Sequence, residues 1–230
     1  MNIELAKNLL EAVPDLKLGI NHYTKITVSE SPQMLKGKLQ LFQEQLFFEL
    51  EDKSITDLAP IKEWRTIWKT LGADPNRYRN SSEALMRRIK QENFIKPFHN
   101  AVDLNNFLSL QHSIPMGIYD FQKIVGDVLV TTGTNDDGYD GLNGRFNSLK
   151  DIILLKDDYS SFGSPYVDSI RTAVTEETTE ALHIYFLRPS MDAAKAFELT
   201  RACGNMFTSL SGGDVRSYVL HEGQTSITVV

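Results

Sequence analysis

A short polar run near residue 170 holds the densest group of chemically useful side chains in the chain. Asp168, Ser169, Arg171 and Thr172 lie within five residues of one another. An Asp–Arg pair with two hydroxyls offers both signs of charge, and it can bind an amino group, a carboxyl group or a ribose hydroxyl. The alternative is an ion pair between Asp168 and Arg171 that only orders the loop, and spacing alone favours this structural role.

A second polar group interrupts an apolar segment upstream. Asp103, Asn105 and Asn106 break the run VDLNNFLSL, and Pro115-Met116-Gly117 then predicts a tight turn into Tyr119. Asp103 can act as a helix N-cap and Asn105 can face solvent. The residue types alone therefore leave both a structural and a binding role open for this segment.

Signatures of other chemistries do not occur in the sequence. It contains no GxxxxGK[ST], GxGxxG, HExxH, CxxC or GxSxG motif. The five histidines are scattered without metal-ligand spacing, and His183 is expected to be structural or exposed. Cys203, the single cysteine, is expected to be a packed thiol. We therefore expect no cofactor, no metal and no disulfide.

Charge is distributed unevenly along the chain. The net charge of −6 over 230 residues argues against a protein that holds nucleic acid by bulk charge, and no DNA partner is expected. Residues 61–99, however, hold nine Lys or Arg against four Asp or Glu. This segment forms either a solvated helix face or a surface for a phosphate backbone. The candidates for RNA binding are Arg79, Arg87, Arg88 and Lys90.

The sequence lacks the features of a membrane or secreted protein. No run approaches about 18 consecutive apolar residues, which a spanning helix needs. The N-terminal residues do not form a signal peptide, and a single cysteine suits a reducing compartment. We expect no membrane partner and a cytoplasmic location.

Hydrophobic periodicity predicts the elements that must position these side chains. Helices are expected over 3–12, 34–50, 61–71, from Asn80 onward, over 101–112, and from Ser190 to about Leu210. Strands are expected over 16–28, near 127–132, 151–156 and 182–187, and as a C-terminal hairpin of 215–220 with 225–229. The loop over 131–145 is expected to be a flexible surface loop that can cover a pocket. Because helices and strands do not alternate regularly, the order favours an α+β fold.

The two polar segments also resemble a known family. VDLNNFLSL followed by IPMGIYD resembles the D-x-T-N-Y … P-x-H-x-F-D stretch of the B3/B4 domain, the editing domain of the phenylalanyl-tRNA synthetase β subunit. Stand-alone B3/B4 proteins carry a YR-x-S-x-E-x-L-x-R-R motif, which 78–88 resembles, and a GSP…DS-x-RT motif, which 163–172 resembles. The resemblance implies an α+β fold with a mixed sheet and surrounding helices. It divides the chain into 1–60, an extension packed on the core, and 61–230, the B3/B4-like domain.

This resemblance implies a function associated with tRNA. In the synthetase, the domain removes tyrosine wrongly attached to phenylalanine tRNA. A free-standing relative is expected to hydrolyse the ester of a mischarged aminoacyl-tRNA. The alternatives are a non-catalytic module that binds tRNA or another RNA, and a pocket for a small metabolite such as an amino acid. The family's site-lining asparagine corresponds to Asn106, whereas its histidine falls at Gly117.

The editing hypothesis assigns roles to both polar segments. Hydrolysis of an activated ester needs a positioned water and a stabilised oxyanion more than a strong nucleophile. Asn106 would orient the water or the substrate carbonyl, and Asp168 would bind the α-ammonium, so both should line one cleft. Arg171 would hold the phosphate or ribose of the terminal adenosine. The predicted substrate-binding residues are Asp103, Gly117, Tyr119, Ser169, Arg171 and Thr172.

Overall fold

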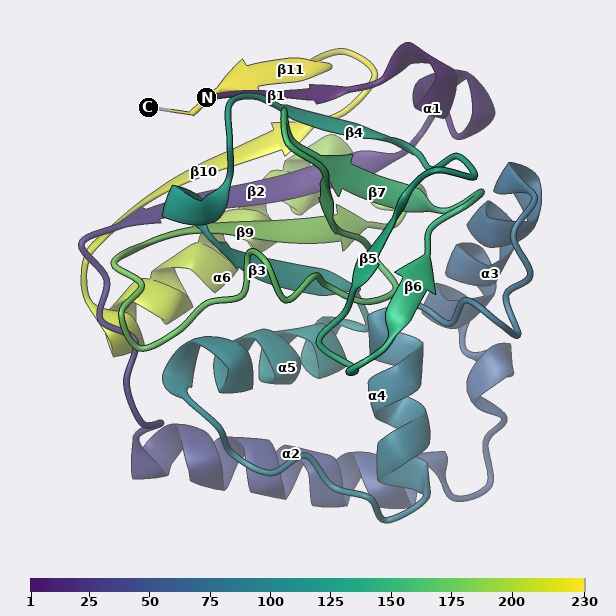
Figure 1. The fold of residues 1–230 in the computed structure, drawn as a ribbon. Helices are drawn as coiled ribbons and strands as arrows, with labels where there is room; N and C mark the ends of the chain where they lie inside the picture. The colour runs from purple at the N-terminus through teal and green to yellow at the C-terminus, as the bar shows by residue number, and fades with distance from the viewer. Residues whose placement is uncertain (230) are drawn as a thin grey trace.

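Two β-sheets form the centre of the protein in the computed structural model, which describes residues 1–229 (Figure 1). The four-stranded sheet is antiparallel and has the order β10 (Asp214–Leu220), β2 (Lys17–Thr24), β9 (Glu180–Leu187) and β3 (Met116–Asp120). The five-stranded sheet is mixed and has the order β11 (Ser226–Thr228), β1 (Asn2–Leu5), β4 (Val128–Thr132), β7 (Ile153–Lys156) and β8 (Ser161–Gly163). A small ribbon joins β5 (Gly138–Asp140) to β6 (Phe146–Ser148).

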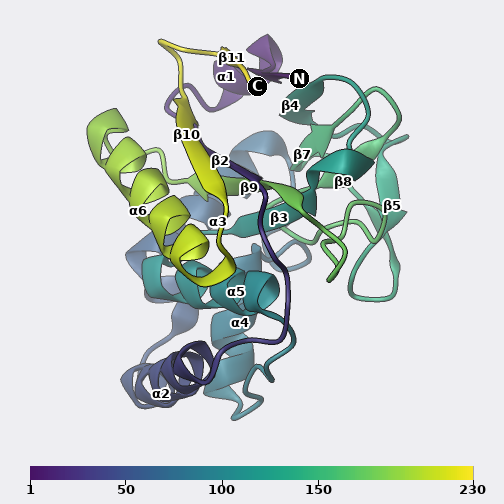
Figure 2. The same ribbon diagram turned by 90° about the vertical axis from the view of Figure 1, so that its left-hand side faces the viewer.

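Helices cover the face of the four-stranded sheet that points away from the five-stranded one (Figures 1 and 2). On that face α5 and α6 lie directly against the sheet, and α2 and α4 pack on α5 as an outer layer. The chain thus has an α+β fold with a mixed sheet and surrounding helices, as predicted. The helix bounds are α1 (Lys7–Ala12), α2 (Gln33–Leu50), α3 (Ala59–Leu71), α4 (Ser81–Lys90), α5 (Asn100–His112) and α6 (Ala193–Ser211), with short 3-10 turns η1 (Ile55–Asp57) and η2 (Phe121–Lys123).

The four-stranded sheet is buried on both faces, and β9 shows why its sequence is apolar almost throughout. Leu182 and Ile184 face the five-stranded sheet in one apolar core. Tyr185 and Leu187 belong to a second core with the helices. A strand that is covered on both sides reads as a continuous apolar run instead of an alternating one.

Two helix termini follow the expected local chemistry. The side chain of Asn80 accepts a hydrogen bond from the backbone N–H of Glu83 at 2.9 Å and so caps α4. Gly72 ends α3 with a φ of 95°, a left-handed conformation that favours glycine. Together these ends fix the connection that leads from α3 to the family motif at residues 78–88.

Two local predictions were wrong, and a third was right only in part. The expected helix over 3–12 divides into β1 and α1, because Ile3 and Leu5 alternate inward and pair with flanking strands. The cap of α6 is Asp192, not Ser190. The C-terminal hairpin is limited to its turn: His221 and Gln224 form an antiparallel bridge, but beyond it β10 pairs with β2 and β11 pairs with β1, so the chain passes from one sheet to the other.

The first 60 residues supply central parts of both sheets. Strand β2 lies between β9 and β10, and β1 lies between β4 and β11. Residues 131–145, expected to form a flexible loop, contribute β5 to the small ribbon. In the part of the chain from 1 to 229, no helix has the length and apolar character needed to cross a membrane.

Candidate functional site

The two polar segments of the sequence lie side by side at the edge strand β3. Tyr119 forms a β-bridge with Ala173, and the backbone N–H of Asp120 donates to the carbonyl of Thr172 at 2.9 Å. On the same loop, the carbonyl of Pro165 accepts from the backbone N–H of Ser81 at 2.7 Å, at the N-terminus of α4. The three segments that carry the family resemblance therefore meet at one place.

A tyrosine–aspartate pair forms the centre of this place. The hydroxyl of Tyr119, which is fully buried, donates to Oδ1 of Asp168 at 2.6 Å. Gly117 and Gly163 border this hydroxyl so closely that a Cβ on either one would collide with it. Tyr119 therefore occupies the space that a histidine at position 117 would need, so the family's histidine does not fit this arrangement.

The surroundings of Asp168 bring the pKa of its carboxyl close to neutral pH. Burial raises the pKa of Asp168 to about 7, although the hydrogen bonds from Tyr119 and from the backbone N–H of Ser164 act in the opposite direction. Burial also raises the pKa of Tyr119 well above its usual value, so its hydroxyl remains a donor. Asp168 is only half-buried when all of its atoms, backbone included, are considered. A carboxyl of this kind suits general acid–base chemistry.

The expected ion pair between Asp168 and Arg171 is not formed, because Arg171 pairs with Asp157. The distance from Nη2 of Arg171 to Oδ2 of Asp157 is 2.9 Å, and the guanidinium also donates to the carbonyls of Lys123 and Ser160. Burial acts to raise the pKa of Asp157, but hydrogen bonds from backbone N–H groups and from Arg171 outweigh it and lower the pKa. Arg171 thus anchors the loop, and its terminal nitrogens are already engaged.

The other predicted residues differ in how far they are free to bind. Asp103 is fully buried and accepts from the backbone of Phe98 and from the hydroxyl of Ser31, so its contacts are structural. Ser169 accepts from the backbone N–H of Arg171 at 3.1 Å. The hydroxyl of Thr172 is buried without a hydrogen-bond partner in residues 1–229.

Asn106 lies on α5, on the other side of β3 from the Tyr119–Asp168 pair. Its side chain is partly exposed and makes no hydrogen bond to another described residue. The neighbouring residue, Asn105, instead contacts His183 in the core between the sheet and the helices. A cleft shared by Asn106 and Asp168 therefore remains a prediction.

The sequence did not reveal a buried polar network around His183. Nε2 of His183 lies 3.0 Å from Oδ1 of Asn105, and Nδ1 lies 2.9 Å from the hydroxyl of Tyr185. Since the amide oxygen can only accept, Nε2 carries the proton and Nδ1 accepts from Tyr185. Asn21 extends the network by donating to Tyr185 at 3.0 Å and to the carbonyl of Thr200 at 2.8 Å. Burial lowers the pKa of His183 to about 3, so the imidazole is neutral.

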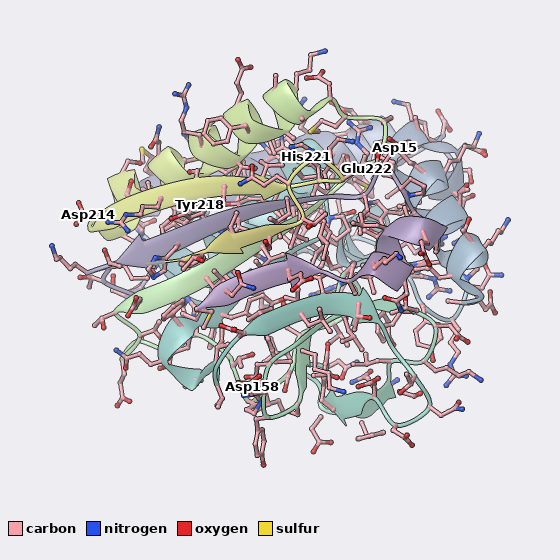
Figure 3. The ribbon with its side chains drawn as sticks, turned by 90° about the horizontal axis from the view of Figure 1, so that it is seen from above. Asp15, Asp158, Asp214, Tyr218, His221 and Glu222 are labelled. Carbon is pink, nitrogen blue, oxygen red and sulfur yellow. The ribbon has the colours of Figure 1, made fainter. Side chains whose placement is uncertain are left out.

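The predicted basic surface is smaller than its sequence suggested. Arg79 and Arg88 are exposed. Arg87, by contrast, pairs with the fully buried Glu83 at 2.8 Å, and Lys90 donates to backbone carbonyls of the segment after α2. Reversing Arg87 to Glu would harm the fold, because the new carboxylate would face the buried carboxylate of Glu83. The face seen in Figure 3 instead carries the exposed carboxylates of Asp15, Asp158, Asp214 and Glu222.

Comparisons with known proteins show the family of the chain. The family model of the B3/4 domain matches residues 63–199. The uncharacterized protein YhzB of Bacillus subtilis (strain 168) is 32% identical over 213 residues, which cover 93% of this chain and 96% of that protein. The phenylalanine–tRNA ligase beta subunit of Mycoplasmoides gallisepticum is 31% identical over 88 residues, 37% of this chain and 11% of that protein.

Among solved structures, similarity is found to an N-terminal fragment of the phenylalanyl-tRNA synthetase beta subunit from Pyrococcus horikoshii. The TM-score is 0.44 at 14% sequence identity, and the match covers 93% of this chain and 50% of that one. The chain therefore spans half of that fragment and a ninth of the bacterial ligase subunit.

Proposed function

Since this chain belongs to the B3/4 domain family and is related to the ligase β subunit, we propose that it acts on tRNA as a trans-acting hydrolase of mischarged aminoacyl-tRNA. The observation that carries the proposal is the Tyr119–Asp168 pair at the junction of the family motifs. A carboxyl with a pKa of about 7 can take a proton from water at neutral pH, and hydrolysis of an ester asks for this step.

The proposed mechanism uses few groups. Asp168 acts as general base toward the hydrolytic water, while the hydroxyl of Tyr119 holds the carboxyl in place. Asn106 has unused hydrogen-bonding groups, but it lies across β3 from this pair, so the mechanism assigns it no contact with the water that Asp168 activates. Arg171 keeps the loop in position through Asp157 instead of touching the substrate.

A deacylation assay over a panel of mischarged tRNAs tests the proposal. We expect ester hydrolysis by the wild type and a loss of tenfold or more in Asp168→Asn, about 1.4 kcal/mol or more in transition-state stabilisation. The matched control is Asp158→Asn, which removes an exposed carboxylate ten residues earlier and should keep full activity. Equal activity of both variants at normal stability would remove Asp168 from the mechanism.

The exposed cations on and beside α4 favour a second candidate, a non-catalytic RNA-binding module. Arg79 and Arg88 are exposed, whereas Arg87 is held by its ion pair with Glu83. Reversing both exposed residues to Glu should weaken tRNA binding and reduce its salt dependence, since each phosphate contact releases counterions. Binding without hydrolysis for every tRNA in the panel would favour this module over the hydrolase.

A further inference from the structure

The outer face of α2 carries an apolar stripe that the fold leaves uncovered. Met34, Leu41 and Phe48 are 59%, 68% and 70% exposed. Residues seven apart return to nearly the same side of an α-helix, so the three side chains form one line about 21 Å long. The opposite side of α2, which includes Leu39 and Leu46, packs into the helical core. In Figure 1, α2 lies at the lower edge of the molecule.

Such a stripe is unusual on a helix that faces only water, whose outer face is normally polar. Gly37 lies in the same line, between Met34 and Leu41, and a Cβ at this position would meet nothing within 4 Å. The missing side chain lets another backbone approach closely. Beside Met34, a hollow of about 60 Å³ opens between α2, α5 and α6, with Phe107 and Met206 in its wall.

The charges that flank the stripe indicate what covers it. On one flank of the stripe, the N-terminal half of α2 carries Lys38 and the C-terminal half carries Glu49, whereas Lys36 lies on the opposite side of the helix and pairs with Glu30. Two copies of this helix in antiparallel orientation bring the basic half of each beside the acidic half of the other. In parallel orientation, Lys38 of one copy and Glu49 of the other would lie eleven residues, about 16 Å, apart along the helix axis and could not meet. Opposite charges across a helix pair set its orientation in this way.

The apolar residues fit the same antiparallel arrangement. A two-fold axis at Leu41 places Met34 opposite Phe48 of the second copy, at the hollow beside α6. Lys38 and Glu49 are eleven residues apart, about three turns, so they lie on the same flank of the stripe. In a two-fold antiparallel pair, like flanks face one another, and Lys38 approaches Glu49 of the second copy.

We propose that this protein forms a homodimer through α2, with two α2 helices packed antiparallel about Leu41. The interface is small, because a helix of 18 residues is about 27 Å long and a single helix pair buries less than the roughly 800 Å² per partner of a standard interface. The dimer is therefore reversible and depends on protein concentration. The inference does not rest on the hydrolase proposal.

Sedimentation equilibrium from low micromolar to near-millimolar protein tests the dimer. We expect the wild-type mass to rise toward two chains, and Leu41→Lys to remain a monomer throughout. Gln40→Lys is the matched control, since it adds the same side chain one residue away, off the stripe, and should dimerise like the wild type. A wild type that stays monomeric at every concentration overturns the proposal. If this monomer also floats with anionic lipid vesicles in a density gradient, the stripe binds a membrane surface instead of a second copy.

Disulfide trapping tests the orientation. Leu41→Cys lies on the two-fold axis and should oxidise to a covalent dimer. Phe48→Cys should not, because its two copies lie about 21 Å apart, far beyond the 7 Å between Cα atoms that a disulfide allows. The native Cys203 is buried and does not interfere. Cross-linking of Phe48→Cys but not of Leu41→Cys would overturn the antiparallel arrangement.

Charge exchange gives an independent check on the same helix pair. Lys38→Glu and Glu49→Lys should each weaken the dimer by placing like charges together. The double variant restores opposite charges and should dimerise nearly as well as the wild type. Loss of the dimer in the double variant, with both single variants unaffected, would show that these flanks do not meet.

Discussion

Two buried polar clusters lie on opposite faces of the four-stranded sheet, and both join a titratable group to a tyrosine hydroxyl. Around His183, the imidazole and its partners are enclosed between the sheet and the helices, and burial holds the imidazole neutral with a pKa of about 3. Around Asp168, burial acts in the same way on a carboxyl but brings its pKa to about 7, and the residue keeps some contact with solvent.

The contrast separates a structural cluster from a candidate site. In both clusters burial disfavours the charged form. For a histidine this moves the pKa away from neutrality, whereas for an aspartate it moves the pKa toward neutrality. Only the second change leaves a group that gains and loses protons under physiological conditions. The polarity of a cluster is therefore a weaker guide to function than the direction of its pKa shift.

The largest effect is expected where the loop of Asp168 is anchored. Arg171→Ala removes the ion-pair partner of Asp157, to which three backbone N–H groups still donate, together with the bonds to the carbonyls of Lys123 and Ser160; the lost bond to the charged group alone costs about 1.5–3 kcal/mol. Urea unfolding should show this loss, with Arg171→Lys intermediate. If Arg171→Ala unfolds like the wild type, the loop is held by other contacts.

A similar but smaller loss is expected in the His183 cluster. Asn21→Ala removes the donor to Tyr185 and to the carbonyl of Thr200, and each buried group left unpaired costs about 1–3 kcal/mol. Deacylation per folded molecule should stay unchanged, because this cluster is expected to be structural. A loss of activity beyond the loss of folded protein would break the contrast between the two clusters.

The pH dependence of stability should distinguish Asp168→Asn from the wild type. In the unfolded chain an aspartate titrates near pH 4, but in the folded protein Asp168 titrates at about 7. Between these values the folded state retains a proton that the unfolded state has lost. Wild-type stability from this group is thus fully present below about pH 4, falls as the pH rises to 7, and is constant above.

Asp168→Asn lacks this titration and should gain stability relative to the wild type over that interval. Denaturant unfolding of both proteins at several pH values between 4 and 8 measures the difference. A constant difference across this range would show that Asp168 has an ordinary pKa in the folded protein.

The smallest effect concerns the hydroxyl of Tyr119. Its hydrogen bond lowers the pKa of Asp168, so Tyr119→Phe should raise that pKa further and move the pH profile of deacylation to more alkaline values. Carbon NMR of the Asp168 carboxyl follows the titration directly. The titration of the remaining carboxyls is the internal control, and a profile displaced toward acid would contradict the role of Tyr119.

Much of the fold follows from local sequence signals. The apolar faces of α2 and α5 and the cap at Asn80 are encoded within a few residues, so their helices lie where predicted. Short strands such as β8 were not predicted, because three residues carry too little periodicity to stand out. The pairing of β11 with β1 depends on contacts across the whole chain, so local signals predicted the turn between His221 and Gln224 but not the partners of the two strands.

The sequence predicted which residues belong to the candidate site better than it predicted the hydrogen bonds and ion pairs that these residues form. Tyr119 and Asp168 were both candidates, yet their hydrogen bond spans 49 residues and has no local signal. Sequence proximity instead suggested that Asp168 pairs with Arg171, whose partner is Asp157. The replacement of a motif histidine by Gly117 was visible in the sequence, but the structure was needed to show that the hydroxyl of Tyr119 takes its place.

The pairing of the first strands with the last has a consequence for synthesis on the ribosome. Strand β2 needs β10, and β1 needs β11, so neither sheet reaches its full set of hydrogen bonds until residues 214–228 have left the exit tunnel. Until then the nascent chain carries apolar strand edges that have no partner, and such edges promote aggregation. Slow folding dominated by long-range contacts is therefore expected, together with a dependence on chaperones during translation that a renatured chain at low concentration would not show.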